Sequence, residues 1–203
     1  MTSKKGKAIF DIINRLISIL PVFFWVFLIF GFEEPCIAII SIVAALVHEG
    51  GHILYILWRR GRLNFKGVLS GFRIKPKEAL TYSEEIMTYA AGPLTNLTFF
   101  LLFSFLAPAF GSLMWEIAII NFATAVSNLM PIEGYDGYGV IRAYLEGKNK
   151  AYLARCVLKR ISSALTFFLC IISLYMIDRM GGGYWIFGVF FISTIKCIKD
   201  DLG

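Results

Sequence analysis

Charged residues are scarce in this sequence of 203 residues. Asp, Glu, Lys and Arg make up 17% of the chain, whereas a soluble domain has about 25%. Apolar residues make up 58%, and the mean hydropathy is +0.70. They lie in long uninterrupted runs, which is the pattern of transmembrane helices. The scarcity of charge therefore excludes an ordinary soluble domain, and we expect the lipid bilayer to surround most of the chain.

Cysteine is also sparse, and its four positions include no C-x-x-C pair. The sequence therefore predicts neither a disulfide framework nor a thiolate metal site. Basic residues interleaved with aromatics on a soluble face are lacking too, so the net charge of +6 does not indicate nucleic-acid binding. No repeat or linker divides the chain. We expect one membrane-embedded domain over residues 1–203, with a core at 36–146 and accessory helices at 8–32 and 161–198.

The long apolar runs predict an all-α polytopic membrane protein with about six transmembrane helices. Thr81 and Glu84 form a capping-box pattern ahead of the third helix. Residues 59–80 are too polar to span the bilayer. Alternation around Phe72 and Ile74 predicts a short membrane-associated β-strand or hairpin there, after the second helix. The expected helices are 12–32, 36–58, 86–107, 113–131, 161–178 and 183–198.

Basic residues gather on one side of these expected spans. The segments 1–15, 59–80, 132–160 and 196–203 contain every Lys and Arg except Arg179. The positive-inside rule places these segments, and with them both termini, in the cytoplasm. We expect an integral, multi-pass protein of a bacterial cytoplasmic membrane.

The only two histidines of the chain lie in the sequence HEGGH at residues 48–52, inside the second expected helix. Residues four apart share one face of a helix, so the imidazoles of His48 and His52 can reach one ion. Glu49 is placed to act on water beside that ion. Ionisable groups at membrane depth are costly and mark function more often than they serve as core histidines. The pattern predicts a catalytic zinc site slightly to the cytoplasmic side of the bilayer midplane.

A catalytic zinc takes three protein ligands and keeps a fourth position open. Because there is no third histidine, the missing ligand must be a carboxylate near the membrane. Asp136 is the best candidate, since Pro131 and the flanking glycines break the fourth helix, and non-helical backbone at this depth lines a cavity. Glu133 is the rival ligand; its alternative interpretation is a solvated loop carboxylate.

A second polar cluster opens the third expected helix around Asn96. Small residues here could simply serve helix packing. The amide of Asn96 nevertheless needs hydrogen-bond partners inside the membrane, and an unwound substrate backbone could supply them.

Three motifs, in this order, resemble those of the site-2 protease family of intramembrane metalloproteases. They are H-E-x-x-H at 48–52, G-x-x-x-N at 92–96 and N-x-x-P-x-x-x-x-D-G at 128–137. The compact six-span plan also resembles the branch that contains the sporulation pro-sigma-factor-processing protease. The last motif departs from the family at Gly134 and Tyr135, where Pro and Leu are common.

The resemblance implies cleavage of peptide bonds in or near transmembrane segments of membrane-protein substrates. An example is the release of a membrane-tethered transcription or sigma factor, under control of a membrane regulatory partner. Matched position by position, the motifs imply His48, His52 and Asp136 as ligands of one Zn²⁺ ion and Glu49 as the base. They also imply that Asn96 and Asn128 contact the substrate backbone or the tetrahedral intermediate.

Three other interpretations stay open at this point. A catalytically inactive scaffold of the same fold is disfavoured by the intact Glu49. A membrane zincin of the prenyl-protein-processing type takes a glutamate from a distal helix, and only Glu116 is available for that. A transporter needs polar residues in both halves of the membrane, whereas here they gather on the cytoplasmic side.

Overall fold

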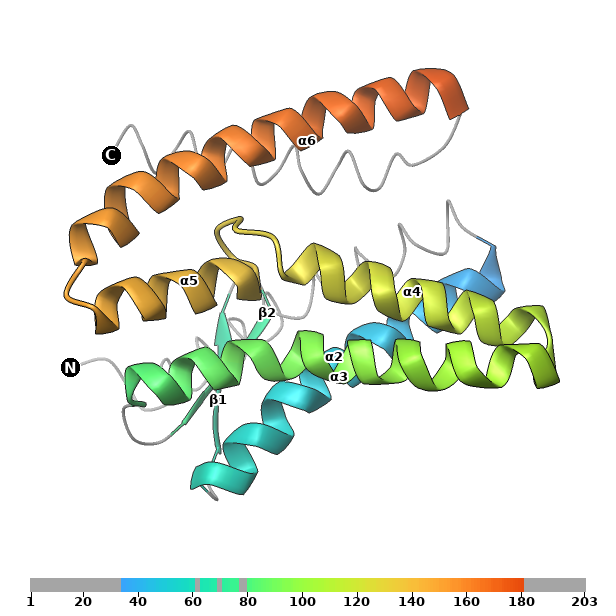
Figure 1. The fold of residues 1–203 in the computed structure, drawn as a ribbon, viewed down its shortest axis with the longest axis horizontal. Helices are drawn as coiled ribbons and strands as arrows, with labels where there is room; N and C mark the ends of the chain where they lie inside the picture. The colour runs from blue at the N-terminus through green and yellow to red at the C-terminus, as the bar shows by residue number, and fades with distance from the viewer. Residues whose placement is uncertain (1–33, 61–62, 69–70, 77–79, 181–203) are drawn as a thin grey trace, which may run out of the picture.

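The computed structural model describes residues 34–60, 63–68, 71–76 and 80–180 (Figure 1). The first and sixth expected spans, 12–32 and 183–198, lie outside these residues. The described elements, in chain order, are α2 (Pro35–Arg60), β1 (Leu63–Val68), β2 (Gly71–Pro76), α3 (Tyr82–Phe110), α4 (Ser112–Asn128), α5 (Asp136–Gly147), a π-helical turn η1 (Leu153–Val157) and α6 (Leu158–Met180).

Local sequence explains where helices α2 and α3 begin. Pro35 is the first residue of α2, where a missing N–H costs nothing because first-turn N–H groups have no helical partner. Thr81 caps α3: its hydroxyl accepts a hydrogen bond from the backbone N–H of Glu84, and the Glu84 carboxylate accepts one from the N–H of Thr81. The predicted capping box is confirmed, and α3 begins at Tyr82 rather than at residue 86.

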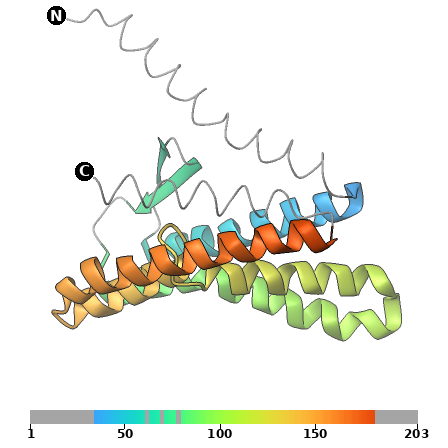
Figure 2. The ribbon, with the colours of Figure 1, turned by 90° about the horizontal axis from the view of Figure 1, so that it is seen from above.

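Helix α3 is the centre of the described structure, and it packs against α2, α4 and α5. It forms an antiparallel pair with α4, and the chain turns between them at Gly111, whose φ of +92° favours glycine (Figure 1). Helices α4 and α5 follow each other along α3, with residues 129–135 between them (Figure 1). Helix α6 lies against α5 and η1 and runs along the helical layer (Figure 2).

Strands β1 and β2 form an antiparallel hairpin directly after α2, with Leu63 opposite Pro76 and Val68 opposite Gly71. The hairpin occupies the part of the 59–80 segment where alternation predicts it. It contacts α2 and projects to one side of the helices (Figure 2).

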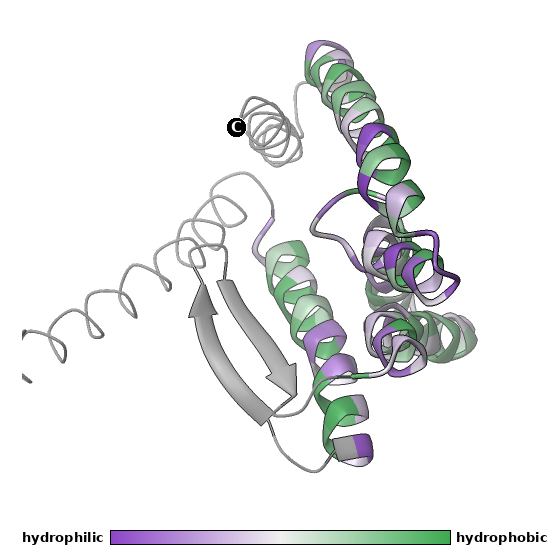
Figure 3. Ribbon diagram, turned by 90° about the vertical axis from the view of Figure 1, so that its left-hand side faces the viewer, coloured by the Kyte–Doolittle hydropathy of each residue, from purple (hydrophilic) through white to green (hydrophobic). Residues whose placement is uncertain are grey.

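Small side chains make up most of the buried apolar residues of the described chain. Close approach of helix backbones through small residues is the packing mode of membrane helices. Large apolar side chains point outward instead: Phe105 is 83% exposed and Trp58 is 80% exposed. Hydrophobic residues, in green, recur along the helices (Figure 3). The buried alanines are Ala38, Ala44, Ala107, Ala118, Ala125, Ala143 and Ala154.

Three segments of the described chain are long and apolar enough to cross a membrane: Pro35–Arg59, Tyr82–Phe110 and Leu153–Arg179. They contain the second, third and fifth expected spans. Helix α4 is shorter than the expected span 113–131, because it ends at Asn128, ahead of Pro131. Its 17 residues lie at the lower end of the range of about 17–25 residues that cross a bilayer.

Candidate metal centre

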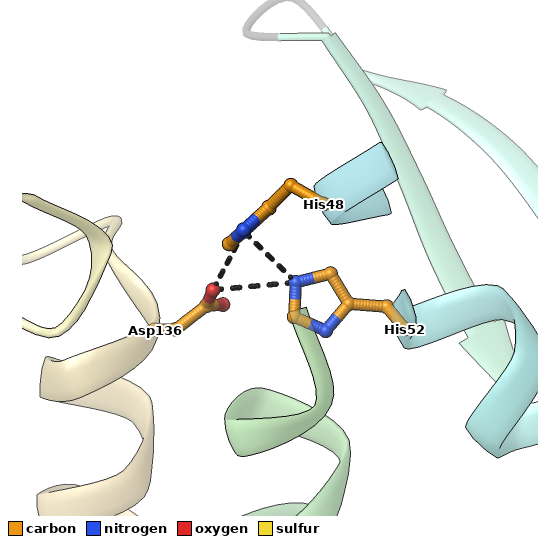
Figure 4. A group of neighbouring side chains, drawn as sticks. All are labelled: His48, His52 and Asp136. Carbon is orange, nitrogen blue, oxygen red and sulfur yellow. Dashed lines mark hydrogen bonds and ion pairs between the residues drawn. The ribbon is translucent and has the colours of Figure 1, made fainter. Parts of the chain in front are cut away.

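Side chains from two helices that are far apart in the sequence converge on one point (Figure 4). His48 and His52 lie on successive turns of α2, and Asp136 is the first residue of α5. The two Nε2 atoms are 3.2 Å apart, and Asp136 Oδ2 lies 2.9 Å from His48 Nε2 and 3.2 Å from His52 Nε2. The side chains are largely shielded from solvent, at 7%, 13% and 14% exposed for His48, His52 and Asp136.

A backbone carbonyl fixes the proton position on His52. Its Nδ1 lies 2.7 Å from the carbonyl oxygen of Thr88 on α3. A carbonyl oxygen only accepts hydrogen bonds, so Nδ1 carries the hydrogen and the Nε2 of the neutral ring presents a lone pair.

A buried amide contacts His48 in the same way. The Nδ1 of His48 lies 2.8 Å from the Oδ1 of Asn96. The Nδ2 of Asn96 donates to the carbonyl oxygen of Ala44, 3.0 Å away, and to the Oδ1 of Asn121, 2.8 Å away. Because the Ala44 carbonyl only accepts, the amide nitrogen must face it and Oδ1 must face His48. The Nε2 of His48 therefore also presents a lone pair.

Three hydrogen-bond acceptors thus meet with no donor between them. The Oδ2 of Asp136 is buried and has no hydrogen-bond partner. Bringing acceptors together out of water is unfavourable unless a cation lies among them. Any two ligand atoms of a tetrahedral zinc ion, with bonds of about 2.0–2.2 Å, lie about 3.3–3.6 Å apart. The two Nε2 atoms and the Oδ2 atom are separated by similar distances, 2.9–3.2 Å. Two imidazoles and one carboxylate fit such an ion.

Two glycines allow α2 and α3 to approach closely at this point. A Cβ atom on Gly92 would overlap the imidazole rings of both His48 and His52. A Cβ atom on Gly51 would overlap the Thr95 side chain and the backbone of α3. The glycine of the G-x-x-x-N motif therefore provides the space that the two rings occupy.

The segment between α4 and α5 fixes the position of Asp136. Gly137 packs so tightly on the backbone of Leu129 that a Cβ atom would overlap its carbonyl group. The N–H of Glu133 donates a hydrogen bond to the Oγ of Ser162 on α6, 2.7 Å away. This non-helical segment is therefore held from two sides, by the end of α4 and by α6.

The other predicted site residues do not belong to this group of three. Glu49 is exposed on α2, one residue after His48. Asn128 is the last residue of α4, half-buried, and its Nδ2 donates to the carbonyl of Thr124. The rival ligand Glu133 is half-buried and, among the described residues, does not belong to the group that converges on the histidines.

The structure gives Asn96 a different place from the substrate contact that the resemblance implies. Its side chain is fully buried, at 0% exposed. Its Oδ1 accepts from His48, and its Nδ2 donates to two acceptors. The amide is therefore engaged within the protein, and in this arrangement it faces a histidine rather than a substrate.

Sequence reasoning missed the backbone carbonyls that orient His52 and Asn96. Thr88 and Ala44 act through backbone carbonyls, so their side chains give no signal. Asn121 is detectable in principle, because an amide within an apolar helix needs an internal partner.

The comparisons with known proteins agree with this geometry at the level of the fold. No protein-family model and no curated protein matches the chain. Among solved structures, the chain is similar to the site-2 protease from Methanocaldococcus jannaschii, with a TM-score of 0.64 and 16% sequence identity. The match covers 91% of this chain and 87% of that one. The chain thus has the fold of a site-2 protease, with a group of residues able to hold a metal ion.

Proposed function

We propose that this protein is an intramembrane zinc metalloendopeptidase of the site-2 type. It cleaves peptide bonds in or near transmembrane segments of membrane-protein substrates. One observation carries the proposal: three hydrogen-bond acceptors, from His48, His52 and Asp136, lie close together with no donor between them. Glu49 follows His48 directly in the sequence. The likeness of fold to a site-2 protease supports the same assignment.

Zinc bound by these three residues would supply a Lewis acid that polarises the scissile carbonyl and activates water. The carboxylate of Glu49 accepts a proton from the attacking water and delivers it to the leaving amine as the C–N bond breaks. The exposed position of Glu49 leaves it accessible to substrate. Asn128 has an amide at the end of α4, whose Oδ1 has no hydrogen-bond partner among the described residues, and it contacts the substrate backbone.

The surroundings of the site support the proposal of a membrane-protein substrate. Both histidines lie within one candidate span, and α3, a second one, supplies Thr88 and Asn96. A substrate helix arrives laterally through lipid and must unwind locally, because an intact helix hides its carbonyls in hydrogen bonds. We further propose six spans with both termini in the cytoplasm, as the distribution of basic residues predicts. The compact branch and a role in sporulation stay predictions from the resemblance.

A cleavage assay with two forms of the full chain tests this function. Wild type and Glu49→Gln are purified in detergent, their zinc content is measured, and each is reconstituted in liposomes with single-span membrane proteins. We expect one zinc ion per chain in both forms, and cleavage within or next to the substrate span by wild type alone. Mass spectrometry of the fragments gives the cleaved bond.

The same assay separates the alternatives. An inactive scaffold binds zinc and cleaves nothing in either form. A prenyl-type zincin depends on Glu116, so Glu116→Gln serves as the control variant, and we expect it to retain both zinc and cleavage. Undiminished cleavage by Glu49→Gln would refute the assignment of the base.

A further inference from the structure

A relay of two buried amides connects α4 to the metal-facing ring of His48. Asn121 on α4 accepts a hydrogen bond from Asn96 on α3, and Asn96 accepts one from His48 on α2. Asn121 is 3% exposed and Asn96 is 0% exposed, so water does not compete for these bonds. Asn121 is itself oriented, because its Nδ2 donates to the carbonyl of Ile117, 2.9 Å away.

The direction of every hydrogen bond in this relay is determined. The carbonyl oxygens of Ile117 and Ala44 only accept, so they require the Nδ2 groups of Asn121 and Asn96 to face them. The Oδ1 of Asn121 then faces Asn96, and the Oδ1 of Asn96 faces His48. Flipping either amide would oppose two acceptors or two donors in a buried place, which costs free energy.

We infer that Asn96, oriented by Asn121 and by the carbonyl of Ala44, is a positioning residue that fixes the Nδ1–H tautomer of His48. This tautomer leaves the lone pair of Nε2 aimed at the ion. The relay thereby makes the affinity of the metal centre depend on the placement of α4. The inference rests on the proposed function only in taking the cluster as a metal site.

The two histidines differ in how they are fixed, which supplies an internal control. His52 is held by the backbone carbonyl of Thr88, which no side-chain substitution removes. His48 is held by a side chain. Changes at Asn96 or Asn121 should therefore alter the ring of His48 and leave that of His52 unchanged.

Nitrogen-15 NMR of the full chain in detergent micelles tests the inference directly. The chain has two histidines, so labelling histidine alone gives the signals of two rings. In chelator-treated wild type, at a pH where imidazoles are neutral, we expect both rings to be protonated at Nδ1. In Asn96→Leu, which keeps the branched shape and the number of side-chain heavy atoms, we expect His48 to show a mixture of tautomers and His52 to stay unchanged.

Zinc affinity, measured by competition with a chromogenic chelator, gives the second readout. Loss of a group that orients a metal-bound histidine weakens binding by about 10–100-fold, and we expect this for Asn96→Leu. Asn96→Asp keeps an acceptor for the Nδ1–H of His48, so we expect it to retain the tautomer, with lower stability because its second oxygen faces the acceptors of Ala44 and Asn121. Asn121→Leu should weaken binding by less than Asn96→Leu, because the Ala44 carbonyl still orients Asn96.

Thr166→Val is the matched control, because Thr166 is fully buried and bonds within its own helix, α6. It should change neither readout. The inference is overturned if Asn96→Leu keeps the His48 tautomer and wild-type affinity while the His52 signal shows an intact site. Should Asn96→Leu unfold, a wild-type His48 signal and affinity in Asn121→Leu would overturn the coupling to α4. A wild type that binds zinc but cleaves nothing would refute the protease proposal and leave this test valid.

Discussion

Gly92 of α3 lies directly against the imidazole ring of His52, and a Cβ atom at that position would occupy the space of the ring. The same atom would also overlap the ring of His48. One hydrogen atom at the Cα of Gly92 thus separates the backbone of α3 from both imidazoles. The spacing of the metal centre therefore depends on a residue that is not one of the three candidate ligands.

Gly92→Ala should abolish zinc binding without unfolding the protein. Alanine favours a helix over glycine by about 1 kcal/mol, so α3 itself is not weakened, while the methyl group displaces both rings. Zinc content and circular dichroism of the purified protein are the measurements. Gly50→Ala is the control, since nothing lies within 4 Å of a Cβ there. Full zinc content in Gly92→Ala would contradict the packing described.

Asp136→Ala should leave the protein with well under one zinc ion per chain. Two imidazoles remain, and a structural or catalytic zinc needs at least a third protein ligand. The variant Glu133→Gln removes the rival carboxylate, and it should keep the full zinc content. The reverse result, with zinc lost only in Glu133→Gln, would assign the third ligand to Glu133.

Removal of metal should lower thermal stability as well as activity. A ligand that binds only the folded state stabilises it by about 4 kcal/mol when its free concentration is about 1,000 times its Kd. We expect a chelator to lower the unfolding temperature of wild type and to stop cleavage, with both restored by added zinc. The chelator should have little effect on the unfolding temperature of Asp136→Ala, which serves as the control.

Gly137→Ala should destabilise the junction between α4 and α5. The added methyl group meets the backbone of Leu129, which cannot rotate away as a side chain can. Overpacking of this kind costs about 1–3 kcal/mol, and we expect weaker zinc binding because Asp136 is the neighbouring residue. Gly147→Ala is the control, because the atoms nearest to its Cβ would belong to the Tyr82 side chain, at 3.1 Å and beyond. Chemical unfolding in detergent compares the two variants.

Thr81→Ala should weaken the start of α3 without affecting the metal centre. Loss of a threonine cap costs about 0.5–2 kcal/mol, and here both hydrogen bonds of the capping box depend on Thr81 adopting the cap geometry. We expect lower stability in chemical unfolding with zinc content unchanged. A loss of zinc would show that the start of α3 controls the position of Thr88, about two turns further on.

Much of the metal centre can be predicted from the sequence, because its chemistry is concentrated in few residues. The spacing of His48 and His52 follows from helix geometry, and the absence of a third histidine leads to a carboxylate. The sequence does not predict α5, since Gly137, Gly139 and Gly147 lower its helix propensity. Tertiary packing requires these glycines instead: Gly139 lies so close to the ring of Tyr89 that no side chain fits between them.

The hydrogen-bond partners of the histidines are harder to predict, for a different reason. A backbone carbonyl such as that of Thr88 accepts a hydrogen bond irrespective of its side chain, so only the three-dimensional arrangement shows which one is used. Asn96 illustrates the same limit. Its motif identifies it as part of the site, but the structure shows its amide turned toward His48 and Asn121.

The wide separation of the ligands along the chain has a consequence for biosynthesis. The ribosome makes residues 48 and 52 long before residue 136. Helix α5 and the preceding residues 129–135 must therefore be in place before the three ligand atoms meet. A partly inserted chain therefore holds an incomplete set of ligands. The metal-binding group is complete only once the chain through α5, the sixth described element, has been made and has packed against α2.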